Sequence, residues 1–205
     1  YFRKDGEIVA YDDVQTLSRE DILKICSERF EEDFAYTDSK GQRYRINSFF
    51  TKGKLALVIR VINDEAVKLK GEFINKVIDE KILALKDGLV LISGITGSGK
   101  STTLANIIEK FNENKSIKIL TIEDPIEYIF ENKKALIIQR ELGTDVESFE
   151  KALKSSLRQD PDVIVLGEIR DEESLFSALK LAETGHLVFS TLHTMNAVES
   201  INRLI

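Results

Sequence analysis

The chain has 205 residues, of which 42% are hydrophobic and 31% charged, and its 29 Lys and Arg against 35 Asp and Glu give a net charge of −6. This length can bury one large or two small cores, and the acidic balance argues against a general nucleic-acid or acidic-membrane surface. No apolar run approaches the roughly 18 to 20 residues of a membrane span, and the single cysteine, Cys26, cannot form an internal disulfide. We therefore expect a cytoplasmic protein whose membrane contacts are peripheral.

Residues 1–62 predict a small α+β domain. Two strand-like runs surround the hairpin signal Asp5-Gly6, and Ser18 is the predicted N-cap of an apolar helix. Two further strands, QRYRINSFF and KLALVIRVI, are separated by a lysine–glycine turn. The polar residues 63–70 form the predicted linker to the rest of the chain.

From residue 71 onward, helical segments alternate with apolar runs, which are LVLIS, IKILTIE, ALIIQ, DVIVLG and HLVFST. Near-continuous apolar strands separated by helices are typical of a parallel sheet covered on both faces. Residues 71–205 therefore predict an α/β nucleotide domain, in which ligands bind at the carboxyl ends of the strands. The final segment, NAVESINRLI, has no helix terminator, so we expect this core to be truncated at its C-terminus.

The sequence GITGSGKS follows the first of these strands directly and precedes the amphipathic segment TTLANIIEKF. A G-x-x-x-x-G-K-S loop between a strand and a helix predicts a phosphate site, because its glycines let backbone N–H groups converge on an anion. Lys100 would reach the β- and γ-phosphates, and the Ser101 hydroxyl would coordinate Mg²⁺. The predicted nucleotide-binding residues are Gly94, Thr96, Gly97, Ser98, Gly99, Lys100, Ser101 and Thr102.

Polar residues also follow three other predicted strands. Glu123 is the last residue of IKILTIE, and Asp124 and Glu127 come shortly after it. Glu168 follows DVIVLG, and His193 lies just after HLVFST. Glu168 is a predicted Mg²⁺ ligand, because an unpaired carboxylate after a buried strand is costly without a cation. In phosphoryl transfer to water, one of the three acids Glu123, Asp124 and Glu127 would orient the attacking water, and geometry must decide which.

The two histidines lack the spacing of a zinc site, so we predict no structural metal centre. His186 begins a buried strand and is predicted to be structural, whereas His193 sits where a side chain can sense the γ-phosphate. Residues 39–63 carry six basic side chains and no acid. Arg43 and Arg45 project from one strand face, which suits phosphate contact, although basic residues also protect strand edges.

Four segments together resemble a known family. GITGSGKST, TIEDPIEY, LRQDPDVIVLGEIRD and AETGHLVFSTLHT are similar to the Walker A, Asp box, Walker B and His box of the ATPases of type II secretion and type IV pili. EDFAY and QRYRINSFF resemble the PAS-like N-terminal domain of that family. QRYRINSFF, ENKKALIIQRE and LAETGHLVF are more similar to its pilus-retraction members than to its extension or type II secretion members.

The resemblance implies a RecA-like P-loop NTPase core behind a PAS-like domain, with ATP and Mg²⁺ as cofactors. It also implies a homohexamer at the cytoplasmic face of the inner membrane, in peripheral contact with the pilus platform protein. Carried over by position, Lys100 and Ser101 bind phosphate and Mg²⁺, and Glu168 is the Walker B acid. Glu127 is the catalytic glutamate, and His193 with His186 forms the His box. Arg45 and Arg60 are the N-terminal arginines, with Arg43 a third candidate.

The hypothesis is therefore Mg²⁺-dependent ATP hydrolysis that powers type IV pilus retraction, or twitching motility. Pilus extension and type II secretion are alternatives within the family. A RecA-like nucleic-acid translocase would need a basic channel, and we expect no nucleic-acid partner. A nucleotide-switched adaptor without turnover is a further alternative, against which the acids Glu127 and Glu168 argue.

Overall fold

The computed structural model describes residues 2–4, 7–9, 18–27, 29–62, 69, 71–169, 171–194 and 199. The chain divides into two compact units, one of Tyr1–Tyr36 with Tyr44–Arg60 and one of Thr37–Arg43 with Val61–Ile205. The predicted turn Asp5-Gly6, most of the predicted linker and most of the predicted C-terminal helix lie outside the described residues. None of the helices in the described part of the chain is long and apolar enough to span a bilayer.

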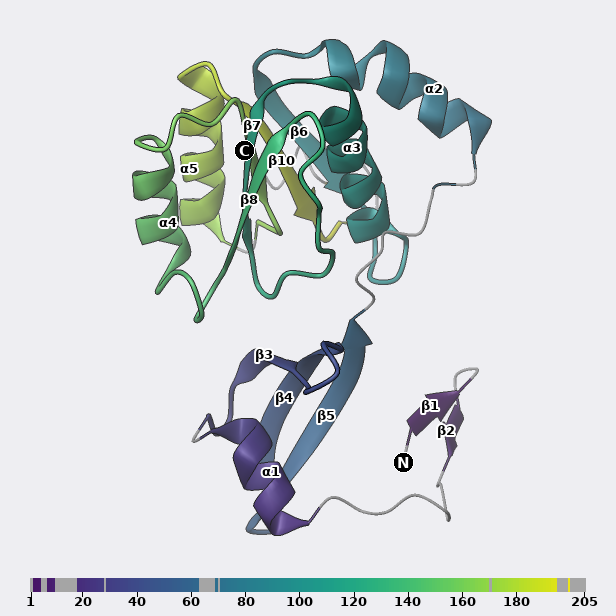
Figure 1. Ribbon diagram of the computed structural model, residues 1–205, viewed down its shortest axis with the longest axis vertical. Coiled ribbons are helices and arrows are strands. Elements are labelled where there is room, and N and C mark those ends of the chain that lie inside the picture. Colours follow the sequence, from purple (N-terminus) through teal and green to yellow (C-terminus); the bar gives the residue numbers. More distant parts are fainter. Residues whose placement is uncertain are drawn as a thin grey trace. The chain divides into compact units, whose positions relative to one another are not determined.

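The smaller unit combines two short sheets with one helix (Figure 1). Its elements are β1 (Phe2–Lys4), β2 (Glu7–Val9), α1 (Arg19–Cys26), β3 (Asp33–Thr37), β4 (Arg43–Thr51) and β5 (Lys54–Ile62). Strands β1 and β2 pair antiparallel, as the hairpin signal predicts, and β3, β4 and β5 form a second sheet in that order. Lys52 and Gly53, both with positive φ, make the two-residue turn between β4 and β5.

Helix α1 begins where the sequence predicts. The Ser18 hydroxyl accepts the Asp21 N–H at 3.1 Å, and the Asp21 carboxylate accepts the Ser18 N–H at 3.0 Å, which completes a capping box. The helix ends in Cys26, which is fully buried with Phe34 and Ile46 of the neighbouring sheet. Cys26 is therefore a core side chain of this unit.

The larger unit is built on a five-stranded parallel sheet with the strand order β6-β10-β9-β7-β8. Its elements are α2 (Glu72–Glu80), η1 (Ile82–Ala84), β6 (Gly88–Ser93), α3 (Lys100–Asn114), β7 (Lys118–Glu123), β8 (Leu136–Glu141), α4 (Phe149–Ser156), β9 (Val163–Leu166), α5 (Glu172–Glu183) and β10 (Leu187–Leu192). The predicted α/β fold with a parallel sheet is confirmed.

Helices cover both faces of this sheet, with α2 and α3 on one side and α4 and α5 on the other (Figure 1). Successive side chains of β9 alternate between the two cores: Val163 and Val165 pack with α2 and α3, whereas Ile164 and Leu166 pack with α4 and α5. All four are at most 3% exposed. Burial on both faces explains why these strands read as continuous apolar runs.

We expect Phe189→Ala to lower the free energy of unfolding by about 3 to 5 kcal/mol, because it leaves a cavity between α3 and β10. The Phe189 ring is fully buried and meets the Phe111 ring edge-on, with centroids 5.8 Å apart. Denaturant unfolding followed by circular dichroism measures the change. The matched control Phe176→Ala removes a ring that is 67% exposed and should stay within about 0.5 kcal/mol of wild type. Equal losses would contradict this account of the core.

Candidate nucleotide site

The loop between β6 and α3 has the backbone shape that its glycines permit. Gly97 and Gly99 have φ of +79° and +91°, in the left-handed region that side chains disfavour. A Cβ on Gly94 would lie 2.6 Å from the Ser98 hydroxyl, so a larger residue there would displace that side chain, which donates to the Ile95 carbonyl oxygen at 2.7 Å. Helix α3 begins immediately after Gly99, and the first N–H groups of a helix have no partner within it. The loop therefore presents a helix N-terminus suited to an anion.

The Lys100 side chain folds back over this loop. It is only 8% exposed, and its Nζ donates to the carbonyl oxygens of Gly94 at 2.9 Å and Ile95 at 3.0 Å. Its other contact is His193 Nδ1 at 3.5 Å, and no carboxylate among the described residues pairs with it. A nearly buried ammonium without an anionic partner favours a bound anion. The loop and its lysine thus fit a phosphate group.

His193 joins the loop to the end of a neighbouring strand. Strands β6, β10 and β9 are in parallel register, so their carboxyl ends lie at one edge of the sheet. His193 Nε2 lies 3.1 Å from Glu168 Oε2, and its Nδ1 lies 3.5 Å from both Lys100 Nζ and Thr96 Oγ1. Since an ammonium only donates, Nδ1 is the acceptor and the ring proton faces Glu168. The structure thereby brings together Lys100, His193 and Glu168.

The acids after β7 differ in their surroundings. The Glu123 carboxyl accepts the Thr121 hydroxyl at 2.6 Å, Gln139 Nε2 at 3.3 Å and the Glu127 N–H. Burial raises the pKa of Glu123 above its usual range, and the nearby charge of Glu127 adds to this shift. The Glu127 side chain makes no hydrogen bond or ion pair with any residue that the structure describes. Glu123 therefore holds the loop, whereas the Glu127 carboxylate is available to a ligand.

The loop that carries Glu127 also touches helix α3. The Tyr128 hydroxyl lies 3.2 Å from Thr102 Oγ1, in the first turn of α3. Ser101, one residue earlier, is exposed, and the Glu168 side chain is 25% exposed. A serine hydroxyl and a carboxylate are hard oxygen donors of the kind that Mg²⁺ prefers, so the chemistry of each side chain suits the predicted metal, whose binding here stays a prediction.

The predicted arginines have different environments. Arg43 is the first residue of β4 but is grouped with the larger unit, where its Nη2 pairs with Glu141 Oε2 at 2.6 Å. Arg45 and Arg60 lie in the smaller unit, Arg45 with its Nε 3.9 Å from Asp33 Oδ1 and Arg60 exposed on β5. Contact of Arg45 and Arg60 with phosphate stays a prediction.

His186 lies at the opposite end of β10 from His193. Its Nδ1 is 3.1 Å from both the Leu181 carbonyl oxygen and the Thr184 hydroxyl, so it fastens the end of α5 to the start of β10. These contacts favour a structural role, as its place in the sequence predicts.

Gln139 and Glu141 of β8 also belong to this site, although no sequence motif points to them. Both hold the backbone of the loop around Glu127, Gln139 at the Tyr128 carbonyl and Glu141 at the Ile126 N–H. The available signal was the segment QRE at the carboxyl end of ALIIQ, where polar residues two apart share one face of a strand.

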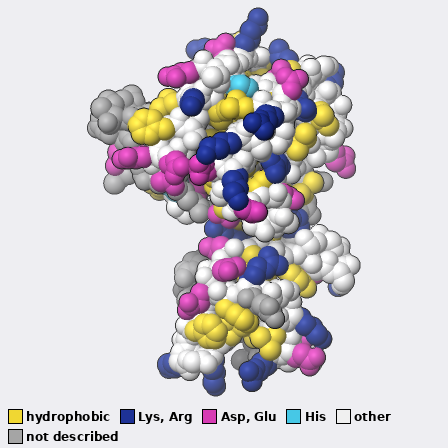
Figure 2. All heavy atoms as spheres, turned by 90° about the vertical axis from the view of Figure 1, so that its left-hand side faces the viewer, with side chains coloured by type: hydrophobic (Ala, Val, Ile, Leu, Met, Phe, Trp, Pro, Cys, Tyr) yellow, Lys and Arg dark blue, Asp and Glu magenta, His cyan; other side chains and the backbone are white. Residues whose placement is uncertain are grey.

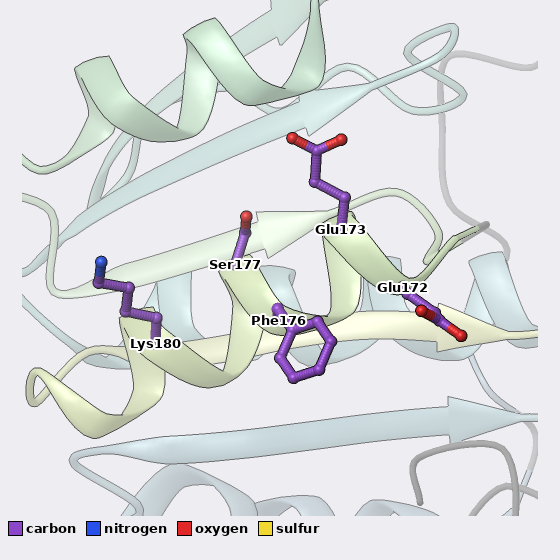
Figure 3. A pocket seen from close by; sticks show the side chains of 5 residues that line it. All are labelled: Glu172, Glu173, Phe176, Ser177 and Lys180. Atoms are coloured by element: carbon purple, nitrogen blue, oxygen red, sulfur yellow. The ribbon is translucent and has the colours of Figure 1, made fainter.

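A hollow of about 460 Å³ lies on the outer side of α5. Its lining side chains, Glu172, Glu173, Phe176, Ser177 and Lys180, all come from that helix (Figure 3). None of the predicted site residues is among them. On the same side of the molecule, basic and acidic side chains are intermixed (Figure 2). Lys154 of α4 pairs with Glu150 of the same helix, and Lys151 of α4 pairs with Glu147, which precedes the helix. This face is thus an ion-paired helix surface.

A comparison with models of known protein families identifies the family of this chain. The model of the family described as "Type II/IV secretion system protein" matches residues 35–205. The chain belongs to this family. The resemblance drawn from its four motifs is therefore confirmed.

Relatives within the type II/IV secretion family include pilus proteins. The chain is 47% identical over 182 residues to the twitching motility protein of Neisseria gonorrhoeae, covering 89% of this chain and 48% of the relative. It is 42% identical over 206 residues to the type IV pilus retractation ATPase PilT of Pseudomonas aeruginosa, covering 98% and 57%. The chain thus spans about half the length of these curated relatives.

A solved structure shares the fold. The crystal structure of the pilus retraction motor PilT with bound ADP matches with a TM-score of 0.86 and 41% identity, over 98% of this chain and 62% of the other.

We expect Glu123→Gln to be stabilising relative to wild type at neutral pH and close to wild type in acid. Because the folded-state pKa of Glu123 is raised, its contribution to stability is complete below the unfolded value near 4.5 and is lost as the pH rises through the folded pKa. Glutamine keeps an acceptor oxygen and never ionises. Thermal unfolding of both proteins from about pH 4.5 to about pH 8 measures the difference in Tm. A difference that moves in favour of wild type as the pH rises would contradict the burial of this carboxyl.

Proposed function

We propose that the chain forms the nucleotide-binding part of an ATPase that powers type IV pilus retraction. The observation that carries this proposal is the constellation at the carboxyl edge of the sheet. Lys100 lies over an anion-binding loop, His193 joins it to Glu168, and the Glu127 carboxylate is unengaged among the described residues. Phosphoryl transfer to water needs cation positioning, a held metal and a group that orients the water.

In the proposed reaction the loop N–H groups and Lys100 bind the phosphates of ATP and place the γ-phosphate at the sheet edge. Ser101 and Glu168 would hold Mg²⁺, which when bound neutralises charge on the β- and γ-phosphates. Glu127 orients the attacking water and accepts its proton. His193 donates its Nε2 proton to Glu168 and so keeps that carboxylate in place beside the loop.

Arg45 and Arg60 are the proposed arginines that contact the terminal phosphate. The two-residue turn at Lys52 and Gly53 sets a register in which Arg45 lies opposite Arg60 on one face of the hairpin. Like charges directly across a strand pair repel, and a shared anion would offset the repulsion. Contact made with ATP and lost after hydrolysis would drive the mechanical step.

We infer a homohexamer at the cytoplasmic face of the inner membrane that works on the pilus platform protein. The support is membership of the type II/IV secretion family and the similarity, over most of this chain, to relatives named for twitching motility and pilus retraction. The same similarity favours retraction over extension or secretion.

Lys100→Ala should weaken nucleotide binding by about 100-fold, which corresponds to about 2.7 kcal/mol, because it removes the one buried cation at the loop. Isothermal titration calorimetry with ADP and with a non-hydrolysable ATP analogue measures the change in Kd. Lys115→Ala, which removes an exposed lysine just after α3, is the matched control and should bind as wild type does. Unchanged affinity in the Lys100 variant would refute the site.

Glu127→Gln and Glu168→Gln should each lower kcat by about 100-fold or more, because one removes the proposed base and the other the proposed metal ligand. Glu123→Gln should lower kcat by less than about tenfold, since its amide oxygen still accepts hydrogen bonds that hold the loop. Phosphate release by the full-length protein is the measurement. If the three substitutions act equally, the assignment of Glu127 is wrong.

A further inference from the structure

The loop that carries Glu127 is held by side chains of the adjacent strand β8. Gln139 Nε2 donates to the Tyr128 carbonyl at 2.7 Å, and Gln139 Oε1 accepts the Phe130 N–H at 2.9 Å. Glu141 Oε2 accepts the Ile126 N–H at 3.1 Å. Because these two β8 residues are two apart, both project from the same face of the strand. The backbone at Ile126, Tyr128 and Phe130 is thus fixed to β8.

Glu141 is itself fixed from several directions. It is 5% exposed, its Oε2 pairs with Arg43 Nη2 at 2.6 Å, and its Oε1 accepts the Thr144 hydroxyl at 3.1 Å. Arg43 Nη1 also donates to the Ile126 carbonyl at 2.8 Å. Glu141 and Arg43 therefore hold the N–H and the C=O of the residue that precedes Glu127. A buried, charge-assisted arrangement of this kind is geometrically specific.

Glu127, which lies between Ile126 and Tyr128, has a hydrogen-bonded backbone but a side chain without a partner among the described residues. The Glu127 N–H is bound by the Glu123 carboxyl, to which Gln139 Nε2 also donates at 3.3 Å. The backbone is thus anchored at three successive residues, whereas the Glu127 carboxylate has no partner among the described residues. Backbone hydrogen bonds of this kind orient a carboxylate and leave its oxygens available to a ligand.

We propose that Gln139 and Glu141 are positioning residues that set the place of the Glu127 carboxylate for attack by water. This inference rests on the proposed function of Glu127 and assigns no contact with nucleotide to either residue. Their proposed role differs from the roles proposed for Lys100, which binds phosphate, and Ser101, which binds Mg²⁺. Misplacing a catalytic group by about 1 Å can lower turnover about 100-fold while binding is retained.

Single substitutions in the full-length protein test whether turnover falls while nucleotide binding is retained. Gln139→Leu keeps the volume but removes the hydrogen bonds, and Glu141→Gln is the milder change that keeps one acceptor. Each should lower kcat by about 10- to 100-fold and change the Kd for ADP by less than about threefold. Arg140→Gln is the matched control, because Arg140 lies between them and bonds Ser155 of α4 on the other face. Its kcat should be that of wild type, and losses of kcat equal in all three variants would overturn the proposal.

A double-substitution cycle separates positioning from general damage. In a Glu127→Gln background, Gln139→Leu or Glu141→Gln should cause no further fall in kcat, because there is no longer a base to misplace. A substitution that merely reduces the folded fraction lowers kcat by the same factor in both backgrounds, and that result overturns the proposal. If Glu127→Gln alone leaves turnover unchanged, the assignment of the base fails first, and the positioning role fails with it.

Discussion

Parallel pairing of β6, β10, β9 and β7 brings the ends of four strands to one edge of the sheet, and the candidate site depends on that alignment. The register places Leu192 beside Ser93 and Ser190 beside Leu166, so β6 and β10 end level, β9 ends two residues earlier, and the residues that follow all three strands leave the sheet at the same edge. The two cores above and below the sheet, built by α2 and α3 and by α4 and α5, hold the strands in this register. A polar site at the edge is therefore supported by an apolar framework.

Two separate groups of side chains lie at that edge of the sheet. Lys100, His193 and Glu168 form a chain of contacts from the phosphate-binding loop to the end of β9. The Glu127 loop is separate from this chain and takes its shape from β8. The proposed binding of phosphate and the proposed orientation of water thereby fall to different parts of the sheet, which suits a reaction in which the two functions must be in place together.

The sequence predicts the strands, the two-sided sheet and the strand-end location of the site, because each depends on local apolar pattern and on the general geometry of parallel sheets. It leaves open which acid after β7 is free, since Glu123 and Glu127 differ only through contacts such as that of Gln139, distant in the chain. It also misses the pairing of Arg43 with Glu141, which are 98 residues apart. Such pairings depend on the three-dimensional arrangement, which no local pattern encodes.

The enclosure of Cys26 has a practical consequence for the study of motion. It is the one cysteine in the sequence, and Phe34 and Ile46 pack around it so that none of its surface is accessible. A thiol reagent therefore meets no exposed native thiol in this chain. Cysteines introduced at exposed sites could carry fluorophores or spin labels without background, and distances between the two units could be followed during nucleotide turnover.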